Sequence, residues 1–329
     1  MRHIEPKDAE VREVFSYLLG GVVPRPIALV STLSADGTPN LSPFSFFNAF
    51  GANPPTVAFA PSRRGRDGTN KDTYHNLIAT KECVVQTVSY DMVEQVSLAS
   101  TEYDVSIDEF TKSGLTPIAS DIVRPPRVAE SLFQMECKMQ QMIELGDGPS
   151  SGNLAICEVV KFHIAERIFD GKQIDPHKID LVARMGADFY CRASGEAVFE
   201  VEKPGLKIGV GYDHIPALIR ESIILSANNL GQLGGIETIP ADSEVESLKK
   251  ELMQIEVDDS KFQEYLSNAD YNKMLALAII SCGENSDELG EKIEQSVKVA
   301  LAEKDLDFAW KAVIIRTQLE RNFHTVKER

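Results

Sequence analysis

Up to about residue 204, apolar residues fall in short runs that turn-forming residues interrupt. Runs of this length, rich in β-branched residues, predict strands rather than helices. The sequence Ser-Ala-Asp-Gly at 34–37 predicts a hairpin turn between the first two strands. Predicted strands cover residues 26–33, 56–60, 83–88, 135–145 and 154–160, and short predicted helices cover 74–80 and 92–99. Several strands with irregular connections indicate an antiparallel barrel rather than repeated βαβ units.

From Gly205 onward the apolar residues recur with a helical period. Leu289, Ile293, Val297, Ala300 and Leu301 fall on one face of a helix. Further predicted helices cover residues 215–225, 243–254, 271–280 and 306–319. A Pro-Gly pair at 204–205 marks the change of pattern. The predicted fold class is therefore α+β, with a β-barrel domain over residues 1–204 and a mostly helical domain over residues 205–329.

Charge and composition narrow the class of protein. The 50 acidic and 34 basic side chains give a net charge of −16, which argues against nucleic acid or an anionic membrane as the main partner. The uncharged run over residues 37–62 is long enough to span a bilayer, but its prolines exclude a membrane helix. No CxxC pair or convincing acidic cluster indicates a metal site. Because the N-terminus lacks an apolar signal segment, we expect a soluble, cytoplasmic protein.

The same uncharged run is rich in aromatic residues. Apolar rings alternate there with small hydrogen-bonding side chains, a mixture that suits a flat heteroaromatic ligand. Taken alone, the run is better interpreted as a strand and a tight loop that bury their own aromatic rings. The rings belong to Phe44, Phe46, Phe47, Phe50 and Phe59, and the polar side chains to Asn40, Ser42, Ser45 and Asn48.

A basic loop follows directly. Arg63, Arg64, Arg66 and Lys71 lie within nine residues, among glycines and hydroxyl side chains. Positive charge and small residues are what a phosphate site requires, although an isolated run of this kind is more often a solvated loop. We expect Asp72 or Thr73 to cap the helix that follows and to leave its first amides facing an anion. An aromatic cradle next to a phosphate loop fits FMN.

Several motifs in this order resemble the flavin reductase-like, FMN-binding split-barrel family. Together they extend over roughly residues 10–195, whereas the helical region after Gly205 carries no motif of the family. The motifs are PRPIALVST (24–32), DGTPNLSPFSFFN (36–48), NPPTVAF (53–59), KDT-x2-N (71–76), PPRVAES (125–131), EC (136–137), EVVKFHI (158–164) and RMGADFY (184–190).

The resemblance implies a six-stranded Greek-key split barrel that forms a homodimer with FMN at the subunit interface. It also implies an oxidoreductase that passes hydride or electrons through the bound flavin. The isoalloxazine would lie against the segment 44–48, largely on backbone groups, and the phosphate against two further segments. The implied cofactor-binding residues are Phe44, Ser45, Phe46, Phe47, Asn48, Ala60, Ser62, Arg63, Lys71, Asp72 and Thr73.

The sequence departs from the family pattern at one place. Many members that use NADH carry Gly-Asp-His before the last barrel strand, where this chain has Gly146-Asp147-Gly148. The change weakens the expectation that NADH or NADPH is the electron donor and leaves the flavin assignment intact. His163 is on the following strand and His75 lies near the phosphate loop, but a lone histidine in a strand is more often structural, so neither receives a catalytic role.

Two functions therefore remain open: a flavin reductase-like enzyme, and a non-catalytic flavin-binding or partner-fed electron-carrier protein. For the helical region we expect apolar faces that need a cover. One interpretation packs part of it near the flavin cleft of the dimer, where it would restrict substrate size. The alternative is a separate bundle that enlarges the dimer or docks another protein.

Overall fold

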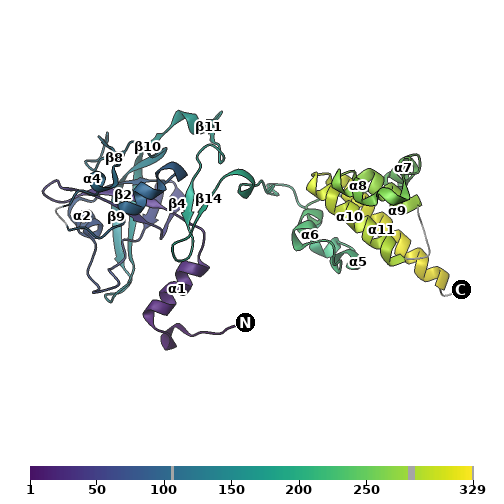
Figure 1. Ribbon diagram of the computed structural model, residues 1–329, viewed down its shortest axis with the longest axis horizontal. Coiled ribbons are helices and arrows are strands. Elements are labelled where there is room, and N and C mark those ends of the chain that lie inside the picture. The colour runs from purple at the N-terminus through teal and green to yellow at the C-terminus, as the bar shows by residue number, and fades with distance from the viewer. Residues whose placement is uncertain (105–106, 281–285, 328–329) are drawn as a thin grey trace. The chain divides into compact units, whose positions relative to one another are not determined.

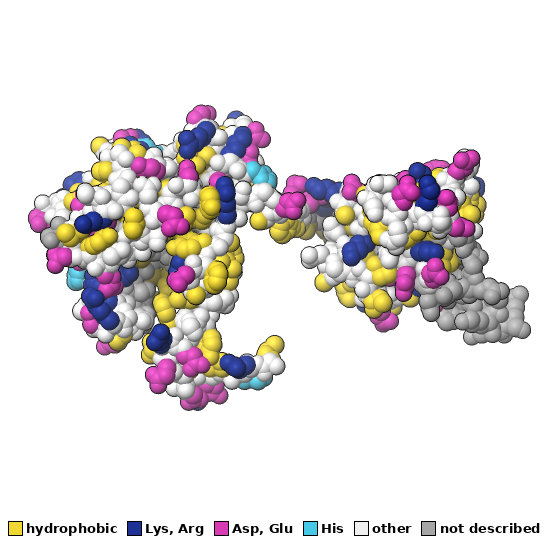
Figure 2. Space-filling model, in the orientation of Figure 1, with side chains coloured by type: hydrophobic (Ala, Val, Ile, Leu, Met, Phe, Trp, Pro, Cys, Tyr) yellow, Lys and Arg dark blue, Asp and Glu magenta, His cyan; other side chains and the backbone are white. Residues whose placement is uncertain are grey.

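The computed structural model describes residues 1–104, 107–280 and 286–327, and the chain forms two compact units, Met1–Glu200 and Val201–Arg329 (Figure 1). The first is built on antiparallel sheets and the second on helices, so the chain has the predicted α+β class. Charged side chains of both signs are interspersed over the visible face of each unit (Figure 2).

The main sheet of the first unit has seven antiparallel strands in the order β3-β2-β6-β9-β10-β5-β4. The strands predicted from the apolar runs are all present, with ends that differ by a few residues. Two strands of the sheet, β3 and β4, were not among those predicted. The seven strands are β2 (Ala28–Leu33), β3 (Pro39–Phe44), β4 (Phe47–Ala52), β5 (Pro55–Phe59), β6 (Glu82–Gln86), β9 (Phe133–Glu144) and β10 (Asn153–Ile164).

The predicted hairpin joins β2 to β3. The amide of Ser34 donates to the carbonyl of Thr38 and the amide of Gly37 to that of Ser34. Gly37 has φ 92°, a left-handed conformation that glycine adopts without steric cost. The turn sets the register that pairs Ala28 with Phe44.

The sheet has one strand more than the six that the resemblance implies. Strand β4 accounts for the difference, because it pairs only with β5 at the edge of the sheet. Five of its six residues are exposed. A residue of β4 therefore adds little to the core, and the apolar pattern that reveals buried strands does not reveal this one.

Both faces of the sheet are covered by buried side chains. On one face, a cluster of buried side chains includes Val30, Phe59 and Val85. On the other face, a second cluster includes Leu29, Leu41 and Phe110. Short elements complete the first unit: η1 (Pro6–Asp8), α1 (Val11–Gly21), β1 (Arg25–Pro26), α2 (Asp72–Thr80), η2 (Tyr90–Met92), α3 (Val93–Leu98), α4 (Glu109–Ser113), β7 (Pro117–Ile118), β8 (Arg127–Val128), η3 (Glu166–Ile168), β11 (Phe169–Asp170), β12 (Gln173–Ile174), β13 (Val182–Arg184), β14 (Tyr190–Arg192) and η4 (Gly195–Ala197).

The second unit packs its helices around a large apolar core and a smaller cluster formed by Phe262, Tyr265, Met274 and Leu277. The five residues predicted to share a face of α10 are all buried in the large core, which confirms the helical period. Trp310 belongs to the same core, is 1% exposed, and its indole donates to the carbonyl of Leu233. The elements are η5 (Tyr212–His214), α5 (Ala217–Arg220), α6 (Ala227–Gly234), α7 (Asp242–Leu252), η6 (Asp259–Lys261), α8 (Phe262–Ser267), α9 (Tyr271–Ile280), α10 (Ser286–Ala302) and α11 (Leu306–Lys327).

The helix predicted over 215–225 is wrong in its extent, because α5 ends at Arg220. The hydroxyl of Ser222 accepts from the amides of Ile224 and Leu225 and donates to Glu294. Serine side chains that bond to nearby amides compete with the helical ladder and end it.

Among the helices of the described ranges, none is long and apolar enough to cross a membrane.

Candidate functional site

The aromatic segment 44–48 lies at the turn from β3 to β4. Phe44 ends β3 and is buried, with its ring centroid 5.5 Å from that of Phe59. Ser45 and Phe46 form the connection and are half-buried, whereas Phe47 and Asn48 begin the exposed strand β4. The segment therefore has one ring fixed in the core and half-buried residues beside it, and it becomes exposed at Asn48.

The structure brings the second predicted segment against the first. The amide of Ala60 donates to the carbonyl of Phe46 over 2.9 Å, and the amide of Ser62 donates to the carbonyl of Ala60. The buried amide of Asn153 donates to the carbonyl of Pro61 and to the side chain of Asn70, which fixes both ends of the basic loop. Segments 44–48 and 60–63 are thus neighbours.

The arginines of the basic loop are held by protein groups but keep unused donors. Arg63 donates from Nη1 to the carbonyl of Gly68 and from Nη2 to Glu144. Arg64 Nη2 forms an ion pair with Asp72 at 3.2 Å. The Nε atoms of both arginines are buried and have no hydrogen-bond partner among the described residues, although Arg64 Nε forms an ion pair with Glu102 Oε1 at 3.8 Å. A buried N–H without a partner costs free energy, so the Nε of Arg63 is suited to an anionic ligand.

Lys71 connects the basic loop with the aromatic segment. Its Nζ lies 5.5 Å from the centroid of the Phe44 ring. Burial lowers the pKa of the Lys71 ammonium. In the described part of the chain, this ammonium has a ring contact but no ion pair with a carboxylate.

The predicted cap of the next helix is wrong. Helix α2 begins after Lys71, which occupies the N-cap position, and no side chain caps its first amides. Asp72 pairs with Arg64 instead, and the hydroxyl of Thr73 accepts from Asn40 over 3.0 Å. Tertiary partners therefore compete successfully with local capping. The first turn of α2 is left without a side-chain acceptor.

A buried polar network that the sequence did not reveal supports this turn. Asn40 Nδ2 and Asn76 Nδ2 both donate to the hydroxyl of Thr32, at 3.3 and 3.0 Å. With the bond from Asn40 to Thr73, the network fastens α2 to the β2–β3 hairpin. Asn76 belongs to the motif KDT-x2-N, and the spacing of that motif was the sequence feature that could have pointed to this network.

Arg25 is a second residue near the aromatic segment that the sequence did not single out. It is 4% exposed, and its Nε donates to the hydroxyl of Ser45 over 3.2 Å. Its guanidinium also lies 5.9 Å from the centroid of the Phe46 ring. The sequence feature that could have pointed to Arg25 was its position in the motif PRPIALVST.

The loop 146–152 lies against the basic loop and carries no histidine. The amide of Arg63 donates to the carbonyl of Ser151 over 2.9 Å. His163 lies on β10, with its Nε2 2.6 Å from Oε1 of Glu136, and His75 is exposed on α2. Glu136 therefore gives His163 a partner inside the fold.

Asp121, Glu136 and His163 place three potential metal ligands together, but their hydrogen bonds do not suit a cation. Glu136 is fully buried and already accepts from three backbone amides as well as from His163. A cation would have to displace these N–H donors. The cluster acts as a structural anchor.

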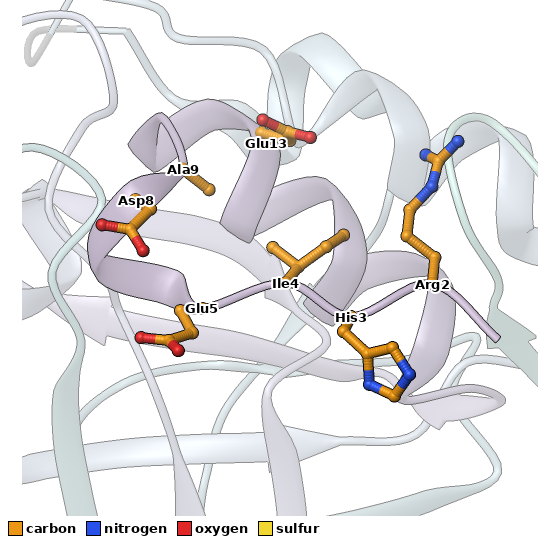
Figure 3. Close-up of a pocket in the computed structure, with 7 residues that line it drawn as sticks. All are labelled: Arg2, His3, Ile4, Glu5, Asp8, Ala9 and Glu13. Atoms are coloured by element: carbon orange, nitrogen blue, oxygen red, sulfur yellow. The ribbon is translucent and has the colours of Figure 1, made fainter.

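A surface hollow lies elsewhere, along the N-terminal segment and the first turn of α1 (Figure 3). It contains none of the predicted flavin residues. Its lining residues are Arg2, His3, Ile4, Glu5, Asp8, Ala9 and Glu13.

The chain belongs to the flavin reductase-like domain family. The family model matches residues 19–175. An uncharacterized protein from Aquifex aeolicus is 35% identical over 196 residues, which are 59% of this chain and 97% of that protein. One from Halalkalibacterium halodurans is 34% identical over 203 residues, which are 61% of this chain and 96% of that protein.

Solved structures agree with this assignment. Nitrilotriacetate monooxygenase component B from Bacillus cereus is 31% identical, with a TM-score of 0.57 over 61% of this chain and 98% of that one. The 2-nitrobenzoate 2-nitroreductase of Pseudomonas fluorescens is 26% identical, with a TM-score of 0.54 over 61% and 97%. A split-barrel protein from Shewanella frigidimarina, 24% identical with a TM-score of 0.53 over 62% and 100%, shares the fold.

Proposed function

We propose that this protein binds FMN on the first unit and works as a flavin reductase-like oxidoreductase. The observation that carries the proposal is the position of Lys71 Nζ, 5.5 Å from the Phe44 ring. It joins a cation of the basic loop to the aromatic segment, so one ligand with a ring and a phosphate can reach both. The family assignment supports the same ligand.

The phosphate would lie on the basic loop. Among the described residues, Lys71 Nζ has no ion pair and the buried Nε of Arg63 has no hydrogen-bond partner. A phosphate dianion offers several acceptor oxygens to such donors. The uncapped first turn of α2 adds backbone amides and the positive end of a helix dipole. These groups match a phosphate better than they match a neutral ligand.

The isoalloxazine would lie along segment 44–48. Phe44 fixes the segment in the core, and backbone groups of the half-buried Ser45 and Phe46 would meet the polar edge of the ring. When bound, FMN supplies hydride and electron transfer, and the protein orients the ring and adjusts its electrostatic surroundings. Because the flavin supplies this chemistry, the proposed reaction does not require an acid–base pair of side chains.

One structural relative is named as a monooxygenase component and another as a nitroreductase, which supports an oxidoreductase. NADH or NADPH is the proposed electron donor. The loop 146–152 lacks histidine, and this observation favours the second candidate, a flavoprotein that receives electrons from a protein partner or only carries flavin.

We further propose a homodimer with the flavin at the subunit interface. Helix α1 has no buried residue, and apolar side chains on α1 and on the edge strand β4 are exposed: Val11 62%, Leu18 49% and Phe50 67%. Phe15 of α1 meets Phe46 edge-on at 6.3 Å, so this uncovered surface adjoins the aromatic segment. A second copy would cover it.

Spectroscopy tests the proposal directly. The purified protein should bind FMN with quenched flavin fluorescence, and stopped-flow mixing with NADH or NADPH should bleach the flavin within seconds. A protein that binds FMN but ignores both nucleotides is the carrier of the second candidate. A colourless protein that shows no quenching on titration with FMN contradicts both. Light scattering of the same sample measures the oligomeric state.

A further inference from the structure

Arg25 is a buried cation whose partners are all neutral. Its Nη1 donates to the carbonyls of Leu19 and Val22 at 2.7 Å, and its Nη2 to that of Met185 at 3.2 Å. Its remaining hydrogen bond goes to the hydroxyl of Ser45. An arginine that is 4% exposed normally pairs with a carboxylate, because desolvating its charge is costly.

A second arginine stands directly opposite. In the ladder between β1 and β13, Arg25 is the register partner of Arg184. Arg184 donates to the carbonyl of Ala187 and lies 4.5 Å from the centroid of the Tyr190 ring, which is again a neutral environment. Neither arginine forms an ion pair within the described ranges, although the chain carries 50 acidic side chains.

This arrangement is unfavourable for folding alone. Like charges directly opposite each other in a sheet are destabilising. Burial lowers the pKa of the Arg25 guanidinium, and the charge of Arg184 lowers it further. A neutral donor could satisfy the carbonyl groups at the end of α1 that Arg25 now binds. The fold therefore does not require the positive charge of Arg25.

The excess charge adjoins the segment proposed to hold the isoalloxazine. Arg25 contacts Ser45 through a hydrogen bond and Phe46 through its ring. A positive charge beside a flavin favours its reduced form, which carries a negative charge on the ring near neutral pH.

We propose that Arg25, assisted by Arg184, stabilises anionic reduced FMN and so raises the reduction potential of the bound flavin. The inference rests on the proposed function, because it requires FMN at segment 44–48. Arg25 acts here through its charge, whereas its hydrogen bonds position Ser45 and the end of α1. The two roles can be separated by substitution.

The experiment measures the midpoint potential of bound FMN in the full-length protein. Arg25→Gln removes the charge and keeps donors, and it should weaken the preference for reduced over oxidised flavin about tenfold, a fall of about 30 mV for a two-electron couple. Arg25→Lys keeps the charge and should stay near wild type. Arg184→Gln should lower the potential by a smaller amount, because Arg184 is only half-buried.

Lys172→Gln is the control, because it removes one positive charge from an exposed turn of the same unit and should not move the potential. A purely structural role predicts the opposite pattern, in which Arg25→Lys shifts the potential as much as Arg25→Gln.

The outcomes are distinct. Wild-type potentials in both Arg25→Gln and Arg184→Gln, with FMN still bound, overturn the inference and leave the proposed function standing. If Arg25→Gln does not fold, Arg184→Gln decides by itself. A wild-type protein that binds no FMN contradicts the proposed function and the inference together.

Discussion

Nε2 of His163 lies 2.6 Å from Oε1 of Glu136, and this contact joins neighbouring strands β10 and β9 inside the first unit. The same carboxylate accepts from the consecutive amides of Asp121, Ile122 and Val123 at 2.8, 2.6 and 2.9 Å. Glu136 is fully buried. A buried carboxylate with this many donors fastens a loop that has no regular structure of its own to the sheet.

The anchor should be measurable in stability. We expect Glu136→Gln to lower the free energy of unfolding by about 3 kcal/mol, because an amide cannot satisfy all the donors that converge on the charged carboxylate. Urea denaturation followed by circular dichroism measures the change. Glu158→Gln is the matched control, since Glu158 is on the adjacent strand and, within the described ranges, its side chain accepts from the exposed Gln140 alone. Equal effects in the two variants would contradict the anchor.

The same carboxylate should make stability depend on pH. Burial acts to raise its pKa, but hydrogen bonds from the Asp121 amide, His163 and the amides of Val123 and Ile122 outweigh it and lower the pKa of Glu136 to about 2 from the usual 4.5. The folded form therefore holds its proton less tightly than the unfolded form. The stabilisation is fully present above pH 4.5 and is lost as the pH falls towards 2.

At about 1.4 kcal/mol per pKa unit, this contribution is about 3 kcal/mol. Urea midpoints measured between pH 2 and pH 7 should show it. The difference between wild type and Glu136→Gln should shrink steadily below pH 4.5. A difference that stays constant across this range would mean that the carboxylate has an ordinary pKa.

The basic loop should discriminate between flavins. Lys71→Gln and Arg63→Gln should each weaken FMN binding about tenfold, because each loses a charge-assisted hydrogen bond to phosphate. Riboflavin lacks the phosphate, so its affinity should change little. Fluorescence titration with both ligands gives the comparison, and Lys172→Gln serves as the control for loss of one positive charge. Parallel losses for FMN and riboflavin would refute the phosphate assignment.

The first unit should fold without the second. Relatives of about 200 residues are matched over 97% and 96% of their length, so a chain of this size suffices for the fold. We expect residues 1–203 to be folded and to bind FMN with unchanged affinity. Circular dichroism and flavin titration test this directly, and an aggregated or flavin-free product contradicts it.

The same truncated protein separates the two expectations for the helical region. Turnover with small and bulky electron acceptors is compared between residues 1–203 and the full chain. Faster reaction with bulky acceptors alone would support a region that restricts substrate size. Unchanged reactivity towards every acceptor would leave the docking module.

Trp310 provides a selective readout for the second unit. It is the only tryptophan of the chain and is buried in the helical core. Its fluorescence should therefore report unfolding of the helices, and we expect the midpoint to be the same in Glu136→Gln and wild type. A Trp310 transition that moves with Glu136→Gln would show that the two units unfold together.

Local patterns determined many of the elements of this protein, although not the exposed edge strand β4. The five apolar residues of α10, the turn at Gly37 and helix α9 over 271–280 depend on periods and turn chemistry that a few neighbouring residues encode. The proximity of an aromatic run to a basic loop was also legible, because both belong to one stretch of chain. The family followed from motifs spread over the first unit.

Only the tertiary structure decided which polar groups meet. Asp72 or Thr73 was expected to cap α2. Instead, the carboxylate of Asp72 forms an ion pair with Arg64, and the hydroxyl of Thr73 accepts from Asn40, 33 residues away along the chain. Arg25 is the register partner of Arg184 and donates to the carbonyl of Met185, 160 residues away along the chain. The carboxylate of Glu136 accepts hydrogen bonds from the backbone amides of a loop. A buried polar atom takes whichever partner the fold brings within about 3 Å, and no local pattern in the sequence records that choice.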